Sequence, residues 1–394
     1  MAELTAPRVA HWPDGARSPL NLMIDDLADV LIPLPGHRRR EQDWGHLGRG
    51  PDSAWRFVEE RILDAWPRLH VSLFIPVNRR PLVEPPPGSR FAAIDSRPEM
   101  VDFLRALAAH PRLECAYHGK DHFLGAGAAR RQEWLCHASV AAAVAETRAG
   151  LEIWGRVFGR PPLGGKYPGY AANEHGDASL ETLGFRWWCR RFNRGPITSL
   201  AATAAELAPR WFAGGELLDL PSTMAGNVLP PLLHGEWLKR PKRLWQRRRL
   251  LPVLRRQIAQ LLEAGLPITI QEHIAPSRED GQRQRNNIQD DLESLGEILA
   301  LAERGALWHA HLSEIADHVR LRERTVLRLE NGALHVDAPR ADMLATLELE
   351  LREPRIVAFV APDGRRAAVR DTPRGRFCAL PLAHRVFQVE EVAA

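Results

Sequence analysis

Short apolar runs alternate with longer amphipathic stretches between about residues 18 and 312 of the chain. The apolar runs predict seven β-strands, and the longer stretches carry apolar residues at positions i, i+3 and i+4, which is typical of helices. The predicted strands are residues 20–24, 70–77, 113–117, 163–166, 185–189, 217–220 and 267–272, and the clearest helices are residues 101–110, 139–158, 251–265 and 286–305. This alternation predicts an α/β fold, either a barrel or a doubly wound sheet, with its ligand site at the carboxyl ends of the strands.

The pattern changes to a period of two after about residue 322, which is typical of antiparallel strands. Asn331-Gly332 and Asp363-Gly364 lie between alternating runs and are strong signals for hairpin turns. We therefore expect residues 1–322 to form an α/β domain and residues 323–394 to form a small, β-sandwich-like accessory domain.

Composition agrees with a folded, globular protein. Hydrophobic residues make up 45% of the 394 residues and charged residues 26%, so the chain can bury a sizeable core. No apolar run is long enough for an export signal or a membrane-spanning helix. The four cysteines show no CxxC spacing, which favours reduced thiols and a cytoplasmic location.

The formal net charge of +4 is too small to indicate nucleic acid as a partner. The charges are unevenly distributed, however, since residues 239–256 contain nine basic residues and no acidic one, with leucines and a tryptophan between them. Two interpretations of this Lys239–Arg256 segment stay open. It is either a solvated helix face, or a surface for peripheral contact with an anionic membrane, a lipid-linked substrate or an acidic glycan.

Three groups of polar residues stand at the ends of predicted strands. Asp25 and Asp26 follow the first strand, His118 and His122 follow the third, and His273 follows the last. Each group alone has an ordinary explanation, such as a helix cap, a chance histidine pair or a buried core histidine. Together they would bring two imidazoles and a carboxylate to one place, with open positions for water and substrate, as in hydrolytic zinc sites.

The order of four motifs resembles the polysaccharide deacetylases, which are NodB-like carbohydrate esterases. The motifs are LMIDD (22–26), HGKDH (118–122), GGKYPGY (164–170) and ITIQEH (268–273), within a resemblance that covers roughly residues 18–312. This resemblance implies a distorted (β/α)7 barrel that removes an N-acetyl group from a saccharide with the help of a metal ion.

The resemblance also implies a role for each residue of the predicted centre. Asp25 would be the general base, and Asp26, His118 and His122 would bind one divalent ion, for which we expect Zn²⁺, with Co²⁺ or Ni²⁺ as alternatives. His273 would be the general acid that protonates the departing amine. Glu272 or Asp29 would be the neighbouring acid that keeps His273 protonated.

The motif at residues 166–170 departs from the family pattern. Lys166 stands where the family has an arginine that orients the base, and lysine cannot form the same forked contact with a carboxylate. The residue after Asp26 is Leu27, where the family has a glycine. Pro168 would shape the wall of the site, and the N–H of Gly169 would stabilise the oxyanion.

Further residues are predicted to contact the substrate. Tyr170 and Trp188 are candidates for stacking on sugar rings, and Glu272 stands beside the predicted acid. Alternative functions are hydrolysis of another amide, an ester or a phosphoester, or a catalytically inactive glycan-binding scaffold. The expected setting is surface-glycan biosynthesis, in an enzyme of the cytoplasm that is peripheral to the membrane and acts on a polysaccharide or on a nucleotide- or lipid-linked precursor.

Overall fold

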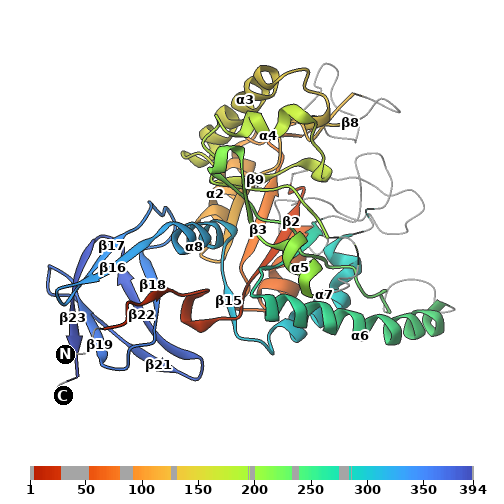
Figure 1. Cartoon of the computed structure of the whole chain (residues 1–394). Helices are drawn as coiled ribbons and strands as arrows, with labels where there is room; N and C mark the ends of the chain where they lie inside the picture. The colour runs from red at the N-terminus through yellow and green to blue at the C-terminus, as the bar shows by residue number, and fades with distance from the viewer. Residues whose placement is uncertain are drawn as a thin grey trace. The chain divides into compact units, whose positions relative to one another are not determined.

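The computed structural model describes residues 4–27, 53–79, 92–125, 131–193, 195, 200–232, 239–274, 284 and 286–392. The chain divides into two compact units (Figure 1). One unit comprises Leu20–Arg304 and His309–Leu312, and the other comprises Met1–Pro19, Gly305–Trp308 and Ser313–Ala394. The predicted domain boundary at residues 322 and 323 remains a prediction.

The larger unit is built on a curled, mostly parallel sheet, and all seven predicted strands are present in it. Their order, with two short flanking strands, is β11-β12-β10-β9-β6-β3-β2-β14-β13. The predicted seven are β2 (Ser18–Asp25), β3 (Val71–Ile75), β6 (Leu113–Tyr117), β9 (Gly164–Lys166), β10 (Trp187–Cys189), β12 (Leu217–Asp219) and β14 (Ile268–His273). Neighbours among them pair in parallel, whereas β11 (Arg210–Phe212) is antiparallel to β12.

Residues 217–225 connect the two ends of this strand order. At the start of the segment, β12 pairs with β10, and at its end β13 (Met224–Ala225) pairs with β14. A parallel bridge between Phe192 and Ser222 extends the first pairing. One bent segment therefore contacts strands from opposite ends of the parallel series.

Helices follow most of the strands, as the sequence predicts. The four predicted helical stretches correspond to α2, α3, α6 and α7. The helices of this unit are α1 (Ala54–Val58), α2 (Pro98–Ala109), α3 (Val140–Phe158), α4 (Glu174–Leu180), α5 (Leu200–Leu207), α6 (Arg240–Ala264) and α7 (Ile288–Ala302). Short hairpins pair β4 (Asn78–Arg79) with β5 (Ala92–Ala93), and β7 (Phe123–Leu124) with β8 (Arg131–Gln132).

The central strands are apolar because helices cover the sheet. Every residue of β2 and β3 is buried, which explains why these strands are near-continuous apolar runs in the sequence.

Among the described helices, none combines the length and the apolar composition that crossing a bilayer needs. All four cysteines are free thiols.

The second unit is mainly β-structure, in agreement with the change of period in the sequence. Its two sheets have the orders β1-β18-β22-β21 and β16-β17-β23-β19-β20, and apolar residues of both enter one core cluster. The strands are β1 (Arg8–Val9), β16 (Val326–Glu330), β17 (Ala333–Asp337), β18 (Thr346–Leu351), β19 (Ile356–Val360), β20 (Arg366–Ala368), β21 (Arg370–Thr372), β22 (Gly375–Pro381) and β23 (Val386–Glu391). Helix α8 (Leu312–Arg324) and the short strand β15 (Leu307–His309) precede them in the chain.

Two features of this unit have clear local causes. Asn331 and Gly332 both have positive φ angles, 51° and 74°, as expected for the predicted two-residue hairpin between β16 and β17. The sequence did not indicate that the N-terminal strand β1 pairs with β18, more than 300 residues later. A two-residue strand has no detectable period, so only the fold reveals this pairing.

Candidate metal centre and active site

Three predicted ligands come together at the carboxyl ends of two strands. Asp26 follows β2, while His118 and His122 follow β6, and their ligand atoms all lie within 4.8 Å of one another. The Asp26 Oδ1 atom is 3.0 Å from His122 Nε2 and 3.6 Å from His118 Nε2. All three residues are buried, so one carboxylate and two imidazoles converge in a sheltered place.

This spacing suits a metal ion. Ligand atoms about 2.0–2.2 Å from a tetrahedral zinc ion stand about 3.3–3.6 Å from each other, close to the two separations found here. Burial lowers the pKa of His118 to about 3, so this imidazole is neutral, as a metal ligand must be. The Nδ1 of His118 lies 3.1 Å from the carbonyl oxygen of Lys166 and can donate to it, which leaves Nε2 free to bind an ion.

A buried glutamate that the sequence did not reveal holds the loop of the two histidines. Glu133 accepts hydrogen bonds from the backbone N–H groups of Lys120, Asp121 and His122, at 2.9–3.2 Å. Burial raises the pKa of Glu133 to about 7, while the same three N–H groups favour its charged form. Its carboxylate thereby fixes the backbone from which His122 extends.

The centre also contains unusual backbone conformations. Five described residues other than glycine have a positive φ angle, and three of them, Asp26, His122 and Tyr170, belong to this region. Left-handed conformations cost such residues roughly 1–2 kcal/mol, so the surroundings must hold them in place. For Asp26, the backbone N–H donates to the carbonyl of Phe74 on β3.

Asp25, the predicted base, makes different contacts from Asp26. Its Oδ1 accepts a hydrogen bond from Lys166 Nζ at 2.6 Å, and its Oδ2 accepts one from Gln271 Nε2 at 3.2 Å. Lys166 is fully buried, and its ammonium group lies 4.2 Å from the ring centroid of Phe74. Lysine thus reaches the carboxylate as a single point contact, where an arginine could form a fork.

His273 lies next to Asp25, since the two residues are partners in the parallel pairing of β14 with β2. The Nδ1 of His273 is 2.7 Å from the carbonyl oxygen of Asn286, to which it can donate. Burial lowers the pKa of His273, whereas the nearby Asp26 and Asp25 raise it. That a neighbouring acid keeps this imidazole protonated stays a prediction.

The structure corrects two predicted substrate contacts. Glu272 is fully buried and lies on the opposite face of β14 from Gln271 and His273. Its carboxyl group packs against Gly226, where an added Cβ atom would stand 1.5 Å from Glu272 Oε1. Trp188 is also fully buried, in edge contacts with Trp134 and other core rings, so no sugar can stack on it. Asp29 lies outside the described residues.

The remaining predicted residues form a turn beside Lys166. Pro168, Gly169 and Tyr170 make a 3₁₀ turn in which Gly169 has a φ of 59°, and a Cβ there would stand 2.5 Å from the side chain of Gln132. Tyr170 is partly exposed, accepts a hydrogen bond from Lys166 Nζ at 3.2 Å, and exchanges a second with Ser222 Oγ at 2.7 Å. The structure thus brings this turn and Asp25 together through Lys166.

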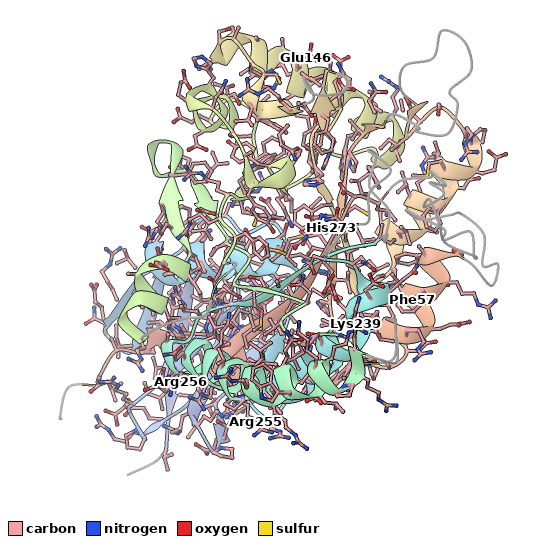
Figure 2. All side chains as sticks on the ribbon, turned by 90° about the vertical axis from the view of Figure 1, so that its right-hand side faces the viewer. Phe57, Glu146, Lys239, Arg255, Arg256 and His273 are labelled. Atoms are coloured by element: carbon pink, nitrogen blue, oxygen red, sulfur yellow. The ribbon has the colours of Figure 1, made fainter. Side chains whose placement is uncertain are left out.

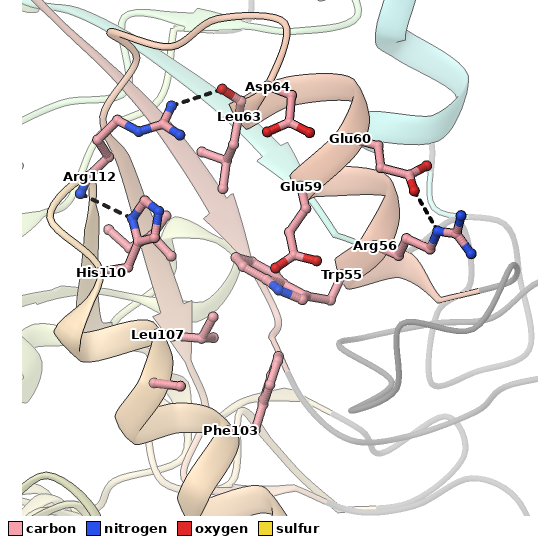
Figure 3. Close-up of a pocket in the computed structure, with 12 residues that line it drawn as sticks. Trp55, Arg56, Glu59, Glu60, Leu63, Asp64, Phe103, Leu107, His110 and Arg112 are labelled. Atoms are coloured by element: carbon pink, nitrogen blue, oxygen red, sulfur yellow. Dashed lines mark hydrogen bonds and ion pairs between the residues drawn. The ribbon is translucent and has the colours of Figure 1, made fainter.

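A cavity of about 650 Å³ lies between α1 and α2, away from the predicted site residues (Figure 3). Acidic, basic and apolar side chains line it, and none of the predicted site residues is among them. The lining includes Trp55, Glu59, Glu60, Asp64, Phe103 and His110. The predicted site residues therefore lie outside this cavity.

Comparisons with known proteins find similarity among solved structures only. No family model and no curated protein matches the chain. Similar solved structures include polysaccharide deacetylases. One is a putative polysaccharide deacetylase from Mycobacterium smegmatis, 19% identical with a TM-score of 0.48, covering 83% of this chain and 100% of that one.

Two further neighbours are comparably distant. A probable polysaccharide deacetylase from Pseudomonas aeruginosa PAO1 is 15% identical with a TM-score of 0.47, covering 81% of this chain and 95% of that one. A Puue allantoinase is 15% identical with a TM-score of 0.46, covering 80% and 94%. At these values the residues of the site itself must carry the functional argument.

Replacing Glu133 tests whether it positions the metal-binding loop. Glu133→Gln keeps the shape but removes one acceptor and turns an amide N–H₂ toward backbone donors, so zinc affinity should fall about 10- to 100-fold. The affinity is measured by competition with a chelator. Glu146→Gln is the matched control, because Glu146 binds the Lys120 side chain on the protein surface at 2.6 Å (Figure 2). Equal affinities of the two variants would contradict this role.

Proposed function

We propose that this protein is a metal-dependent hydrolase that removes an N-acetyl group from a saccharide. The observation that carries the proposal is the pairing of two aspartates with different partners. Asp26 faces two imidazoles, whereas the adjacent Asp25 faces an ammonium group and an amide. Adjacent carboxylates with separate environments suit separate tasks, one holding an ion and the other moving a proton.

The residues of the chain have complementary tasks in this proposal. A divalent ion bound by Asp26, His118 and His122 would polarise the acetyl carbonyl and make a bound water more acidic. Asp25, oriented by Lys166 and Gln271, accepts the proton of the attacking water. The backbone N–H of Gly169 stabilises the developing negative charge on the carbonyl oxygen.

His273 completes the reaction at the nitrogen. Its Nδ1 can donate to the Asn286 carbonyl, so we assign proton transfer to the departing amine to Nε2, which the side-chain amide of Gln284 also approaches at 3.0 Å.

The strand pairing supports a NodB-like distorted (β/α)7 barrel as the scaffold. Seven parallel strands are connected in a cycle if residues 217–225 are counted as one bent strand, because this segment pairs with β10 at one end and with β14 at the other. In such a barrel the residues at the carboxyl ends of the strands meet on one face. Asp25, His118, Lys166 and His273 all stand at such ends.

The proposal predicts acetate release that depends on both aspartates in different ways. Wild-type protein loaded with zinc should release acetate from at least one member of a panel of N-acetylated oligosaccharides. Asp26→Ala should lose the metal and the activity, whereas Asp25→Asn should keep the metal and lose activity by at least about a hundredfold. Metal content is measured by elemental analysis beside the acetate assay. An Asp25→Asn variant with full activity would exclude this mechanism.

The role of His273 can be separated from that of Asp25 by the leaving group. An amine leaves only with a proton, whereas 4-nitrophenolate leaves without one. His273→Gln should therefore lose about 10²- to 10⁴-fold in kcat for an N-acetylated saccharide but keep most of its activity toward 4-nitrophenyl acetate. Asp25→Asn, as the control, should lose both activities. Equal losses for the two substrates in His273→Gln would argue against an acid role.

The alternatives make different predictions in the same assays. A hydrolase of another amide, an ester or a phosphoester would bind the metal but leave the N-acetylated panel untouched. An inactive glycan-binding scaffold would bind saccharides without releasing acetate, whether or not metal is present. The burial of Asp25 beside Lys166, which removes two charges from water, favours an enzyme over a scaffold.

Helix α6 supports a second part of the proposal, contact with an anionic membrane. The basic Lys239–Arg256 segment begins one residue before this helix and extends past its midpoint, and Figure 2 shows Lys239, Arg255 and Arg256 along it. Leu244, Trp245 and Val253 are large apolar residues exposed on the same helix, at 43%, 56% and 38%. Basic and exposed apolar side chains together are typical of helices that lie in the membrane interface.

Vesicle binding tests this contact. The protein should cosediment with vesicles that contain anionic phospholipid and remain in solution with neutral phosphatidylcholine vesicles. The double variant Leu244→Ser/Trp245→Ser should bind more weakly, by about tenfold or more. In the wild-type protein both side chains would move from water into the membrane interface, and serine loses this favourable transfer. Val326→Ser, at a position 50% exposed in the other unit, is the matched control. Equal binding of all three proteins would leave α6 as an ordinary solvated helix.

The cytoplasmic location and the role in surface-glycan biosynthesis remain predictions from the sequence. Cell fractionation tests them, and an enzyme found outside the inner membrane would contradict both.

A further inference from the structure

A smaller cavity of about 300 Å³ borders the candidate active site. Its lining includes Tyr167 and Tyr170, which follow β9, Arg190 and Arg191, which follow β10, and Asp219, the last residue of β12. These three strands are neighbours in the sheet. The cavity therefore lies at the carboxyl ends of the parallel strands, where Asp25 and the predicted metal ligands also stand.

Tyr170 connects the cavity with the catalytic residues. It lines the cavity, and its hydroxyl group is 3.2 Å from Lys166 Nζ, which in turn donates to Asp25. A molecule that fills the cavity is thus separated from the predicted base by one side chain. Volumes near 300 Å³ are at the small end of ligand pockets and suit a single sugar residue.

The charges of the lining do not cancel. Arg191 donates to Asp219 at 2.6 Å, and Arg190 forms an ion pair with Asp177, so two guanidinium groups face two carboxylates. Arg210 on β11 is the third arginine of the lining. Arg210 is exposed, and its side chain forms no hydrogen bond or ion pair with the described residues, although its backbone pairs with that of Asp219 on β12. One positive charge therefore remains for a ligand.

Aromatic side chains accompany this charge. Trp211, the neighbour of Arg210 on β11, is half-buried in the lining, and the Tyr170 ring stacks on Phe192 with centroids 5.0 Å apart. A flat apolar side chain can contact a sugar ring, and the guanidinium group beside it can bind an acidic substituent of that sugar.

We infer that the saccharide substrate carries a carboxylate or phosphate group and that Arg210 binds this group in the cavity beside Tyr170. The inference rests on the proposed deacetylase function and adds the class of saccharide, an acidic one. Arg190 and Arg191 stay paired with their carboxylates and shape the cavity, while Arg210 supplies the net charge. Carboxylate and phosphate share this chemistry, so the choice between them is left to experiment.

The test compares acidic and neutral substrates. The kcat/KM for acetate release is measured with a neutral N-acetylhexosamine oligosaccharide, an N-acetylated aminouronate oligosaccharide and an N-acetylhexosamine phosphate. Wild-type protein should prefer one of the two acidic compounds, and the preferred one identifies the anion. Arg210→Gln should lower this preference over the neutral compound by about tenfold or more.

The matched control is Arg148→Gln, since Arg148 is an exposed arginine on α3 outside the cavity, and it should keep the wild-type preference. A wild-type preference for the neutral compound would overturn the inference. So would equal preferences in Arg210→Gln and Arg148→Gln.

A binding measurement separates this inference from the proposed function. Calorimetric titration of the acidic compounds into Asp25→Asn and into Asp25→Asn/Arg210→Gln needs no turnover. Tighter binding to the first protein by about tenfold or more supports the acidic subsite even if no acetate is released from any compound. Equal binding overturns the subsite even if the wild-type protein is an active deacetylase.

Discussion

The buried contact between Lys166 and Asp25 organises the candidate active site. An ammonium and a carboxylate removed from water cost several kcal/mol each unless they meet in good geometry, and here they lie 2.6 Å apart with almost no exposure. The same lysine acts through its main chain, because its carbonyl oxygen lies 3.1 Å from His118 Nδ1. One residue at the end of β9 thus orients both the predicted base and a predicted metal ligand.

This arrangement explains how two adjacent aspartates can differ in function. Asp25 is the last residue of β2, so strand geometry sets the direction of its side chain toward Lys166 on β9 and Gln271 on β14. Asp26 takes a left-handed backbone conformation, with a φ of 69°, and its carboxylate lies beside the two imidazoles instead. The break in strand geometry between them separates a position suited to proton transfer from one suited to a metal ion.

The sequence predicted the parallel strands well, because strands covered on both faces are near-continuous apolar runs with distinct ends. It also pointed to Asp25, Asp26, His118 and His122, since polar residues directly after such runs stand out. Glu133 and Gln271 were missed because their importance depends on which backbone N–H groups and side chains the fold brings to them. Gln271 had one signal, its position two residues before His273 on the same face of a strand.

The wrong expectations share one physical cause: the fold decides whether a side chain is buried and which face of its strand it lies on. Trp188 was expected to contact sugar, but in a short strand between two layers of side chains it fills the core. Glu272 was expected beside His273, but successive residues of β14 point to opposite faces. A single-residue offset along a strand is therefore enough to move a carboxyl group from the site to the interior.

X-ray absorption spectroscopy of the zinc-loaded protein tests the central claim most directly, since it counts the ligands of the ion. The account predicts two imidazole nitrogens and one carboxylate oxygen from the protein, with solvent oxygen in the remaining positions, and the loss of one imidazole in His122→Ala. A stoichiometric zinc ion with sulfur ligands, an imidazole count that His122→Ala does not change, or no bound zinc at all would contradict it.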